Sequence, residues 1–213
     1  RDAEARGARI RTRCTVVRAR RAGGLWRVEL RHGDGRQETV AARGLVNAGG
    51  PWVGEIIEGR LGIDSTERVR LVRGSHIVTR RLFDHDRCYF FQGSDGRIIF
   101  AIPYERDFTL IGTTDQEHDA DPADARCTEA EQDYLCAFAS RYFARPVTRD
   151  DIVWTYSGVR PLYDDGAKSA TAATRDYVLS LDDGGGGEGG GDGGGAVLLN
   201  VFGGKITTYR KLA

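Results

Sequence analysis

Four basic side chains in this sequence could bind an anion or move a proton, because each lies on or beside the end of an expected strand. They are His76, Arg160, Arg175 and Lys205. A guanidinium group binds phosphate or carboxylate through two hydrogen bonds, and a neutral imidazole is a suitable general base. Each residue also has a structural explanation. Most of the 31 Lys and Arg residues must be solvated, and a lone His is commonly a hydrogen-bonded structural residue.

Residues 196–213 contain a second candidate for ligand binding. They read AVLLNVFGGKITTYRKLA, and the continuous apolar run predicts a strand buried on both faces. Two glycines end that strand, and a helix is expected to open at residues 206–212. Glycine lets a ligand approach the backbone, and a helix start adds free N–H donors. The segment holding Lys205, Thr207 and Thr208 therefore suits an anionic ligand, although an ordinary strand-to-helix connection has the same pattern.

Composition narrows the class of protein. The chain has 213 residues with 31 basic and 31 acidic side chains, so no bulk charge attracts nucleic acid. No apolar run approaches the ~20 residues that span a bilayer. The four cysteines form no CxxC pair and the four histidines no HxxxH pair, so we expect reduced thiols and no metal site. The chain begins without Met and stops inside an expected helix, which leads us to expect a piece of a larger protein.

An antiparallel meander is expected first, followed by a strand–turn–helix unit. The meander strands are predicted at residues 8–18, 25–31 and 38–42. A short strand from Gly44 then ends at a turn formed by Asn47, Ala48 and Gly49, and residues 52–61 have the apolar spacing of a helix. Units of this kind hold dinucleotides in doubly wound sheets.

Strands return in the middle of the chain, with one helix among them. They are predicted at residues 69–72, 76–79, 88–92, 97–103, 108–113, 151–162 and 174–181. Tight breaks at 93–96 and 105–107 predict hairpins. Thr128 and Glu131 form a capping box, and the apolar spacing behind it predicts a helix to about Phe143.

Six ordered segments from Arg43 onward resemble one enzyme family, the FAD-dependent (aerobic-type) glycerol-3-phosphate dehydrogenases. The segments are LVNAGGPW (45–52), LVRGSHIV (71–78), IGTTD (111–115), DDIVWTYSGVRPL (150–162), TRDYVL (174–179) and VFGGKITTYRKLA (201–213). The resemblance implies an α/β (α+β) fold of the D-amino-acid-oxidase-like flavoenzymes. Such a fold has a Rossmann-like FAD-binding domain, here partial, and an antiparallel-sheet substrate domain with a flanking helix.

The resemblance also implies how the chain divides. Residues 1–68 would be part of the FAD-binding domain, 69–181 the substrate-binding domain, and 196–213 a return to the FAD-binding domain. Residues 182–195, almost pure Gly with a few acids, would form a flexible surface loop between them. That loop contains a formal GxGxxG, but no helix is expected to open from it, so the motif is not a phosphate site.

The activity implied by the resemblance is oxidation of sn-glycerol 3-phosphate to dihydroxyacetone phosphate by hydride transfer to FAD, with electrons passing to quinone. Enzymes of this type are peripheral on the cytoplasmic side of the inner membrane, and a homodimer is expected. Arg160, Arg175 and Lys205 match residues around the substrate phosphate, and His76 matches a residue near the reacting hydroxyl. Either His76 takes the C2 hydroxyl proton or Arg160 stabilises the developing alkoxide, and the sequence leaves both open.

Two stretches match residues near the cofactor in that family. They are Asn47, Ala48 and Gly49, and then Gly204, Lys205, Thr207 and Thr208. The N-terminal strand–GxGxxG–helix of the family is absent from this chain. We therefore expect the fragment alone to be flavin-free and inactive.

Two alternatives remain open at the level of sequence. The first is another flavoenzyme, either a glycerol-3-phosphate oxidase that uses oxygen or a different FAD-dependent oxidoreductase. The second is a non-catalytic domain that binds a phosphate metabolite or a partner through its antiparallel sheet. Three cations of suitable type favour a phosphorylated ligand in every case.

Overall fold

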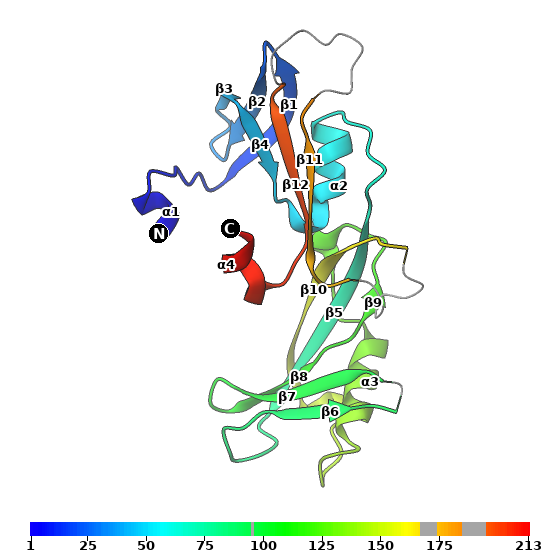
Figure 1. Ribbon diagram of the computed structural model, residues 1–213. Coiled ribbons are helices and arrows are strands. Elements are labelled where there is room, and N and C mark those ends of the chain that lie inside the picture. Colours follow the sequence, from blue (N-terminus) through cyan, green and yellow to red (C-terminus); the bar gives the residue numbers. More distant parts are fainter. Residues whose placement is uncertain (95, 167–173, 185–194) are drawn as a thin grey trace. The chain divides into compact units, whose positions relative to one another are not determined.

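The computed structural model describes residues 1–94, 96–166, 174–184 and 195–213, and its elements are labelled in Figure 1. It divides into two compact units. The first holds residues 1–68 and 177–202 with Leu212, and the second holds residues 69–176 and 203–211 with Ala213. The Gly-rich loop predicted at 182–195 falls mostly outside the described residues.

The first unit begins with a short helix, α1, and the antiparallel meander that the sequence predicts. Their bounds are Asp2–Ala5 for α1, Cys14–Ala22 for β1, Leu25–His32 for β2 and Gln37–Ala42 for β3. The sheet order β1-β2-β3 confirms the meander. Strand β1 starts at Cys14 rather than Ala8, because Cys14 pairs with His32, the last residue of β2.

A second sheet of this unit contains the expected strand–turn–helix. Its order is β11-β12-β4, with bounds Tyr177–Asp182, Val197–Gly203 and Gly44–Asn47, and β12 runs parallel to β4. After β4 come three short helical pieces that together cover the helix predicted at 52–61. They are η1 (Gly50–Trp52), α2 (Val53–Glu55) and η2 (Ile56–Arg60).

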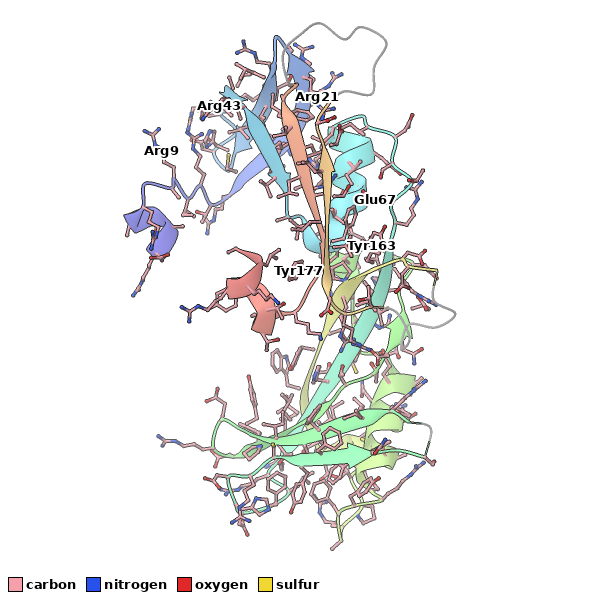
Figure 2. The ribbon with its side chains drawn as sticks, in the orientation of Figure 1. Arg9, Arg21, Arg43, Glu67, Tyr163 and Tyr177 are labelled. Carbon is pink, nitrogen blue, oxygen red and sulfur yellow. The ribbon has the colours of Figure 1, made fainter. Side chains whose placement is uncertain are left out.

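Strand β12 is buried on one face, not on both as the apolar run predicts. Leu198 and Phe202 are fully buried, whereas Val197 is 39% exposed. Leu198 joins Trp26 and Val28 of the meander in one apolar cluster. The Trp26 indole N–H also donates to the Val197 carbonyl at 2.8 Å. The guanidinium of Arg21, a residue labelled in Figure 2, lies over the Trp26 ring, 4.6 Å from its centroid. The meander therefore covers only the face of β12 that carries Leu198.

The second unit is built on a larger sheet ordered β10-β5-β8-β7-β6, with β9 paired to β5. The bounds are Val69–Arg80 for β5, Tyr89–Gln92 for β6, Ile98–Tyr104 for β7, Phe108–Gly112 for β8, Gln116–Glu117 for β9 and Ile152–Tyr163 for β10. The antiparallel pairs β6–β7 and β7–β8 confirm both predicted hairpins. Strand β5 is continuous where the sequence predicted two strands.

Helix α3 (Glu129–Ala139) packs on one face of this sheet. Its capping box is confirmed, with Thr128 and Glu131 bonded reciprocally. Leu135 and Phe138 bury their side chains in an apolar cluster with Ile77 of β5. The helix ends at Ala139 rather than near Phe143, because the Ser140 hydroxyl bonds back to Cys136 and accepts from the Val147 amide at 2.8 Å. Single 3-10 turns flank the helix at η3 (Pro122–Asp124) and η4 (Arg149–Asp151).

The chain ends in two short helical pieces, η5 (Ile206–Thr208) and α4 (Tyr209–Leu212). The helix expected at 206–212 is thus a single 3-10 turn followed by four residues.

The described ranges contain no helix long and apolar enough to cross a membrane. In the same ranges, no group of three His, Cys, Asp or Glu side chains has metal-binding geometry. All four cysteines are free thiols.

Candidate functional site

Three of the predicted cations line one cavity of the second unit. Arg160 reaches it from β10, while Arg175 and Lys205 come from segments far apart in sequence, and Gly204 forms part of the wall. The cavity has a volume of about 430 Å³. Their side chains are 29%, 37% and 50% exposed, so all three can reach a ligand.

Asp115 joins the two arginines. Its Oδ1 accepts from Arg160 Nη1 at 3.0 Å, and its Oδ2 lies 3.6 Å from Arg175 Nη2. Lys205 has a separate partner, with Nζ 3.6 Å from Asp176 Oδ1. Asp115 was not among the predicted site residues, although the IGTTD segment ends on it. The signal that could have found it is a carboxylate at the end of a segment matching the enzyme family.

The Arg160 guanidinium lies directly over Gly74 of β5. A methyl group at Gly74 would be 2.7 Å from Arg160 Cζ, closer than atoms can approach. Arg160 Nη2 also donates to Thr113 Oγ1 at 3.1 Å. Burial is the main reason that the pKa of Arg160 is lowered. Asp115 opposes this shift, and the charge of Arg175 adds to it. Strand β5 therefore needs glycine here to admit a charged group.

His76 lies two residues further along β5, on the same face as Gly74. Its ring stacks on Tyr156 of β10, with centroids 4.7 Å apart and an angle of 4° between the planes. On the other side it covers Gly112 of β8, where an added methyl would be 2.7 Å from His76 Cγ. The imidazole is thus held between two neighbouring strands, and its position is fixed by close packing.

The electrostatics of His76 keep it neutral. Burial, and secondarily the charge of Arg160, lower its pKa from 6.5 to about 4. Among the described residues, no hydrogen-bond partner reaches its buried Nδ1. Buried polar atoms are rarely left unpaired, so this nitrogen lacks the partner that such atoms ordinarily have. A neutral imidazole beside a guanidinium can accept a proton while the guanidinium stabilises the resulting negative charge.

Asn47, Ala48 and Gly49 lie in the first unit, at the carboxyl end of β4. They line a cavity of about 540 Å³ whose other walls include apolar side chains of β4 and η2. The Asn47 side chain is committed to the turn itself. Its amide donates to the Val53 carbonyl at 3.0 Å and to Asn200 Oδ1 at 3.1 Å, and its oxygen accepts from the Gly49 amide.

This cavity suits part of a dinucleotide. Dinucleotides bind beyond the carboxyl ends of parallel strands, and β4 runs parallel to β12. Gly49 lies so close to the helix that an added Cβ would collide with Ile56. Glycine there leaves room for the Ile56 side chain beside the turn. Its backbone at Ala48 and Gly49, rather than the Asn47 side chain, is what a cofactor could contact.

The remaining predicted cofactor residues belong to the second unit. Gly204 and Lys205 line the cavity of the three cations, and Thr207 is exposed in η5. The Thr208 hydroxyl donates to the Lys205 carbonyl at 3.0 Å, which closes the 3-10 turn. The predicted set thus falls into two groups, one in each unit.

The sequence matches one protein family, described as FAD dependent oxidoreductase, over residues 1–200. It is 46% identical over 211 residues to a glycerol-3-phosphate dehydrogenase of Pseudomonas tolaasii, covering 99% of this chain and 40% of the relative. It is also 46% identical over 209 residues to a D-erythritol 1-phosphate dehydrogenase of Brucella abortus, covering 98% of this chain and 40% of that protein. The chain thus spans about 40% of the length of these curated relatives.

A solved structure supports the same assignment. The glycerol-3-phosphate dehydrogenase of Bacillus halodurans, complexed with FAD, matches 99% of this chain and 38% of its own with a TM-score of 0.75 and 29% identity. The resemblance drawn from the six segments is confirmed, as is the predicted fold class.

Proposed function

The chain belongs to the FAD-dependent oxidoreductase family, and from that premise we propose that the full-length protein oxidises sn-glycerol 3-phosphate to dihydroxyacetone phosphate. The observation that carries the proposal is the meeting of Arg160, Arg175 and Lys205 at one cavity. His76 does not line this cavity, but its neutral imidazole is near enough to Arg160 for the guanidinium charge to lower its pKa. A phosphate dianion needs several charge-assisted donors, each contributing about 1.5–3 kcal/mol. Three cations around one cavity meet that need.

The phosphate would be held by the arginines and the lysine together. Arg160 and Arg175 present planar guanidinium groups, which bind phosphate oxygens in pairs. Asp115 holds both groups until the ligand arrives and limits the rotamer freedom that binding must remove. Lys205, which lies between β12 and η5, adds a third positive charge. These contacts orient the rest of the substrate relative to His76.

His76 would then take the proton of the C2 hydroxyl on its imidazole, which is neutral in the folded protein. FAD, when bound, supplies the acceptor for the hydrogen and two electrons that leave C2. Arg160 stabilises the negative charge that develops on the substrate oxygen as the proton moves. In the first unit, the backbone at Ala48 and Gly49 would contact FAD. In the second unit, Gly204, Thr207 and Thr208 would contact it.

The proposal extends to steps outside this chain. We infer that electrons pass to a quinone, that the protein is a homodimer attached peripherally to the inner membrane, and that FAD retention needs the rest of the protein. Replacing quinone by oxygen as the sole acceptor distinguishes a dehydrogenase from an oxidase. Turnover with oxygen alone at the full rate would favour the oxidase.

Flavin reduction in the full-length protein tests the proposal directly. The visible absorbance of the flavin is recorded without acceptor before and after adding sn-glycerol 3-phosphate, with glycerol as the control. We expect bleaching by the phosphate ester and none by glycerol. A flavin whose absorbance does not change with sn-glycerol 3-phosphate would contradict the proposed substrate. A purified protein without flavin would favour the non-catalytic phosphate-binding alternative.

A second substrate follows from the relatives. The identity to the D-erythritol 1-phosphate dehydrogenase equals that to the glycerol-3-phosphate dehydrogenase, 46% in both cases. D-Erythritol 1-phosphate carries the same phosphate and a secondary hydroxyl next to a longer carbon chain. The ratio of kcat/KM for the two esters assigns the preferred substrate.

A further inference from the structure

Glu131 of α3 is a buried carboxylate on the face of the sheet opposite His76 and Arg160. It is 4% exposed. Its Oε2 has the ordinary task of the third residue in a capping box and accepts from the Thr128 amide and hydroxyl, both at 2.9 Å. A capping glutamate needs only one oxygen for this task. The other oxygen is free to bond elsewhere.

Oε1 of Glu131 reaches across to two other segments. It accepts from Ser75 Oγ of β5 at 2.8 Å and from Thr114 Oγ1, just after β8, at 2.7 Å. The same Thr114 hydroxyl accepts from the Ser75 amide at 2.9 Å, which joins the two segments directly. Ser75 Oγ further bonds to Ser157 Oγ of β10 at 2.8 Å. One carboxylate therefore links a helix directly to two segments, β5 and the residues after β8, and through Ser75 to β10.

The residues on either side of these contacts belong to the site. Ser75 lies between Gly74, which is covered by Arg160, and His76. Thr114 lies between Thr113 and Asp115, whose side chains both bond to Arg160. Successive side chains of an extended segment point to opposite faces. Holding Ser75 and Thr114 toward α3 therefore presents their neighbours to the site.

We propose that Glu131 is a positioning residue, which fixes His76, Asp115 and Arg160 through its bonds to Ser75 and Thr114. This inference rests on the function proposed above. Placement errors of about 1 Å can cost roughly a hundredfold in rate, so such a support affects chemistry as well as stability.

The buried negative charge of Glu131 must be stabilised by its hydrogen-bond donors. Burial opposes its ionisation, yet bonds from the Thr128 amide, Thr114, Ser75 and Arg73 outweigh burial and lower the carboxyl pKa. Arg73 Nη2 lies 3.0 Å from Oε2 and compensates the charge. A buried carboxylate that loses a donor draws its surroundings toward other partners. Loss of the Thr114 hydroxyl should therefore shift the segment that carries Asp115.

A matched pair at Thr114 separates positioning from bulk stability. Thr114→Val keeps the shape but removes the hydroxyl, whereas Thr114→Ser keeps the hydroxyl and removes a methyl. In the full-length protein, we expect Thr114→Val to lower the rate constant of flavin reduction by saturating sn-glycerol 3-phosphate about tenfold or more. Thr114→Ser should stay within about twofold of wild type. The rates are compared well below the unfolding temperature of each variant.

Glu131→Gln tests the carboxylate itself. Its single carbonyl oxygen can accept from Thr128 or from Ser75 and Thr114, but not from both groups, so the rate should fall as for Thr114→Val. Glu129→Gln is the control, because this neighbour in the first turn of α3 is 82% exposed and its carboxylate pairs with Arg149 at the surface. Normal rates in Thr114→Val with a lowered unfolding temperature would show a purely structural role and overturn the inference.

Binding of inorganic phosphate separates this inference from the proposed function. Titration calorimetry measures it without any oxidation. If sn-glycerol 3-phosphate fails to reduce the wild-type flavin, the proposed function falls, and the inference is judged by phosphate alone. Weaker phosphate binding in Thr114→Val than in Thr114→Ser supports it. Equal binding in wild type and both variants overturns it.

Discussion

Gly74 and Gly112 leave space on the sheet for the two side chains that would meet the substrate. The Arg160 guanidinium occupies the place of a side chain at Gly74, and the His76 ring does the same at Gly112. The guanidinium is the far end of a flexible side chain and can be displaced at low cost, whereas the imidazole is held near its backbone. A change at Gly74 should therefore affect the site more than the fold.

The first prediction concerns Gly74→Ala. The added methyl displaces the Arg160 guanidinium from its bonds to Asp115 and Thr113, so kcat/KM for sn-glycerol 3-phosphate should fall about tenfold or more. Steady-state kinetics of the full-length protein measure it. Gly54→Ala is the control, because an added methyl there meets no described atom within 4 Å. Unchanged kinetics in Gly74→Ala would show that the position of Arg160 does not matter.

The second prediction concerns the pH dependence that His76 gives to stability. Its pKa is about 4 in the folded protein and 6.5 ordinarily, so between these values the unfolded chain binds more protons. Stability therefore rises with pH across this window and is lost as pH falls through it. We expect the apparent Tm of wild type to rise more steeply over this range than that of His76→Gln. Parallel curves for the two proteins would contradict the lowered pKa.

Strand β5 shows at the level of elements where sequence reasoning succeeds and where it fails. The hairpins, the capping box and the meander follow from turn residues and alternation, which are local properties. The break predicted at Gly74 is wrong, because that glycine serves a close approach by a side chain of β10 rather than a turn. A glycine in the sequence does not show whether it serves a turn or a close approach. Here the approaching side chain is that of Arg160, 86 positions further along the chain.

The same limit applies to the strand–turn–helix of the first unit. Its three elements could be predicted from the apolar run and the glycines. The hydrogen bond from the Asn47 amide to Asn200 could not be predicted. Asn200 lies beside Asn47 because β12 pairs with β4 in parallel. Asn47 takes part in three hydrogen bonds here, and Asn200 takes part in one of those three, which gives the two residues unequal weight.

The third prediction uses that inequality. Asn47→Ala removes the bonds to the Val53 carbonyl, the Gly49 amide and Asn200, whereas Asn200→Ala removes just the last of these three bonds. Each buried group left without a partner costs about 1–3 kcal/mol. We expect Asn47→Ala to lower the flavin content of the purified full-length protein and its apparent Tm more than Asn200→Ala does. Equal losses in the two variants would contradict the assignment of the turn to Asn47.

At the scale of the whole chain, two apolar clusters accompany the two units. One cluster, with Trp26, Val28 and Leu198, contains residues of the first unit only. The other, with Ile77 and Leu135, contains residues of the second unit only. The sequence predicted a division at residues 68/69, and its other boundaries stay predictions for the full-length protein. Which distant segments join each cluster depends on sheet order, and local patterns do not specify that order.

The fourth prediction follows from the separate clusters. Leu135→Ala leaves a cavity in a fully buried site and costs about 2–5 kcal/mol, and Val28→Ala does the same on a smaller scale in the other cluster. Local opening raises amide exchange where packing is lost. In hydrogen–deuterium exchange of the full-length protein, Leu135→Ala should speed exchange in β5–β8 and α3 more than in β1–β3. Val28→Ala should do the reverse. Because each variant is the control for the other, an equal rise in both regions for either one would show that the clusters act as a single cooperative core.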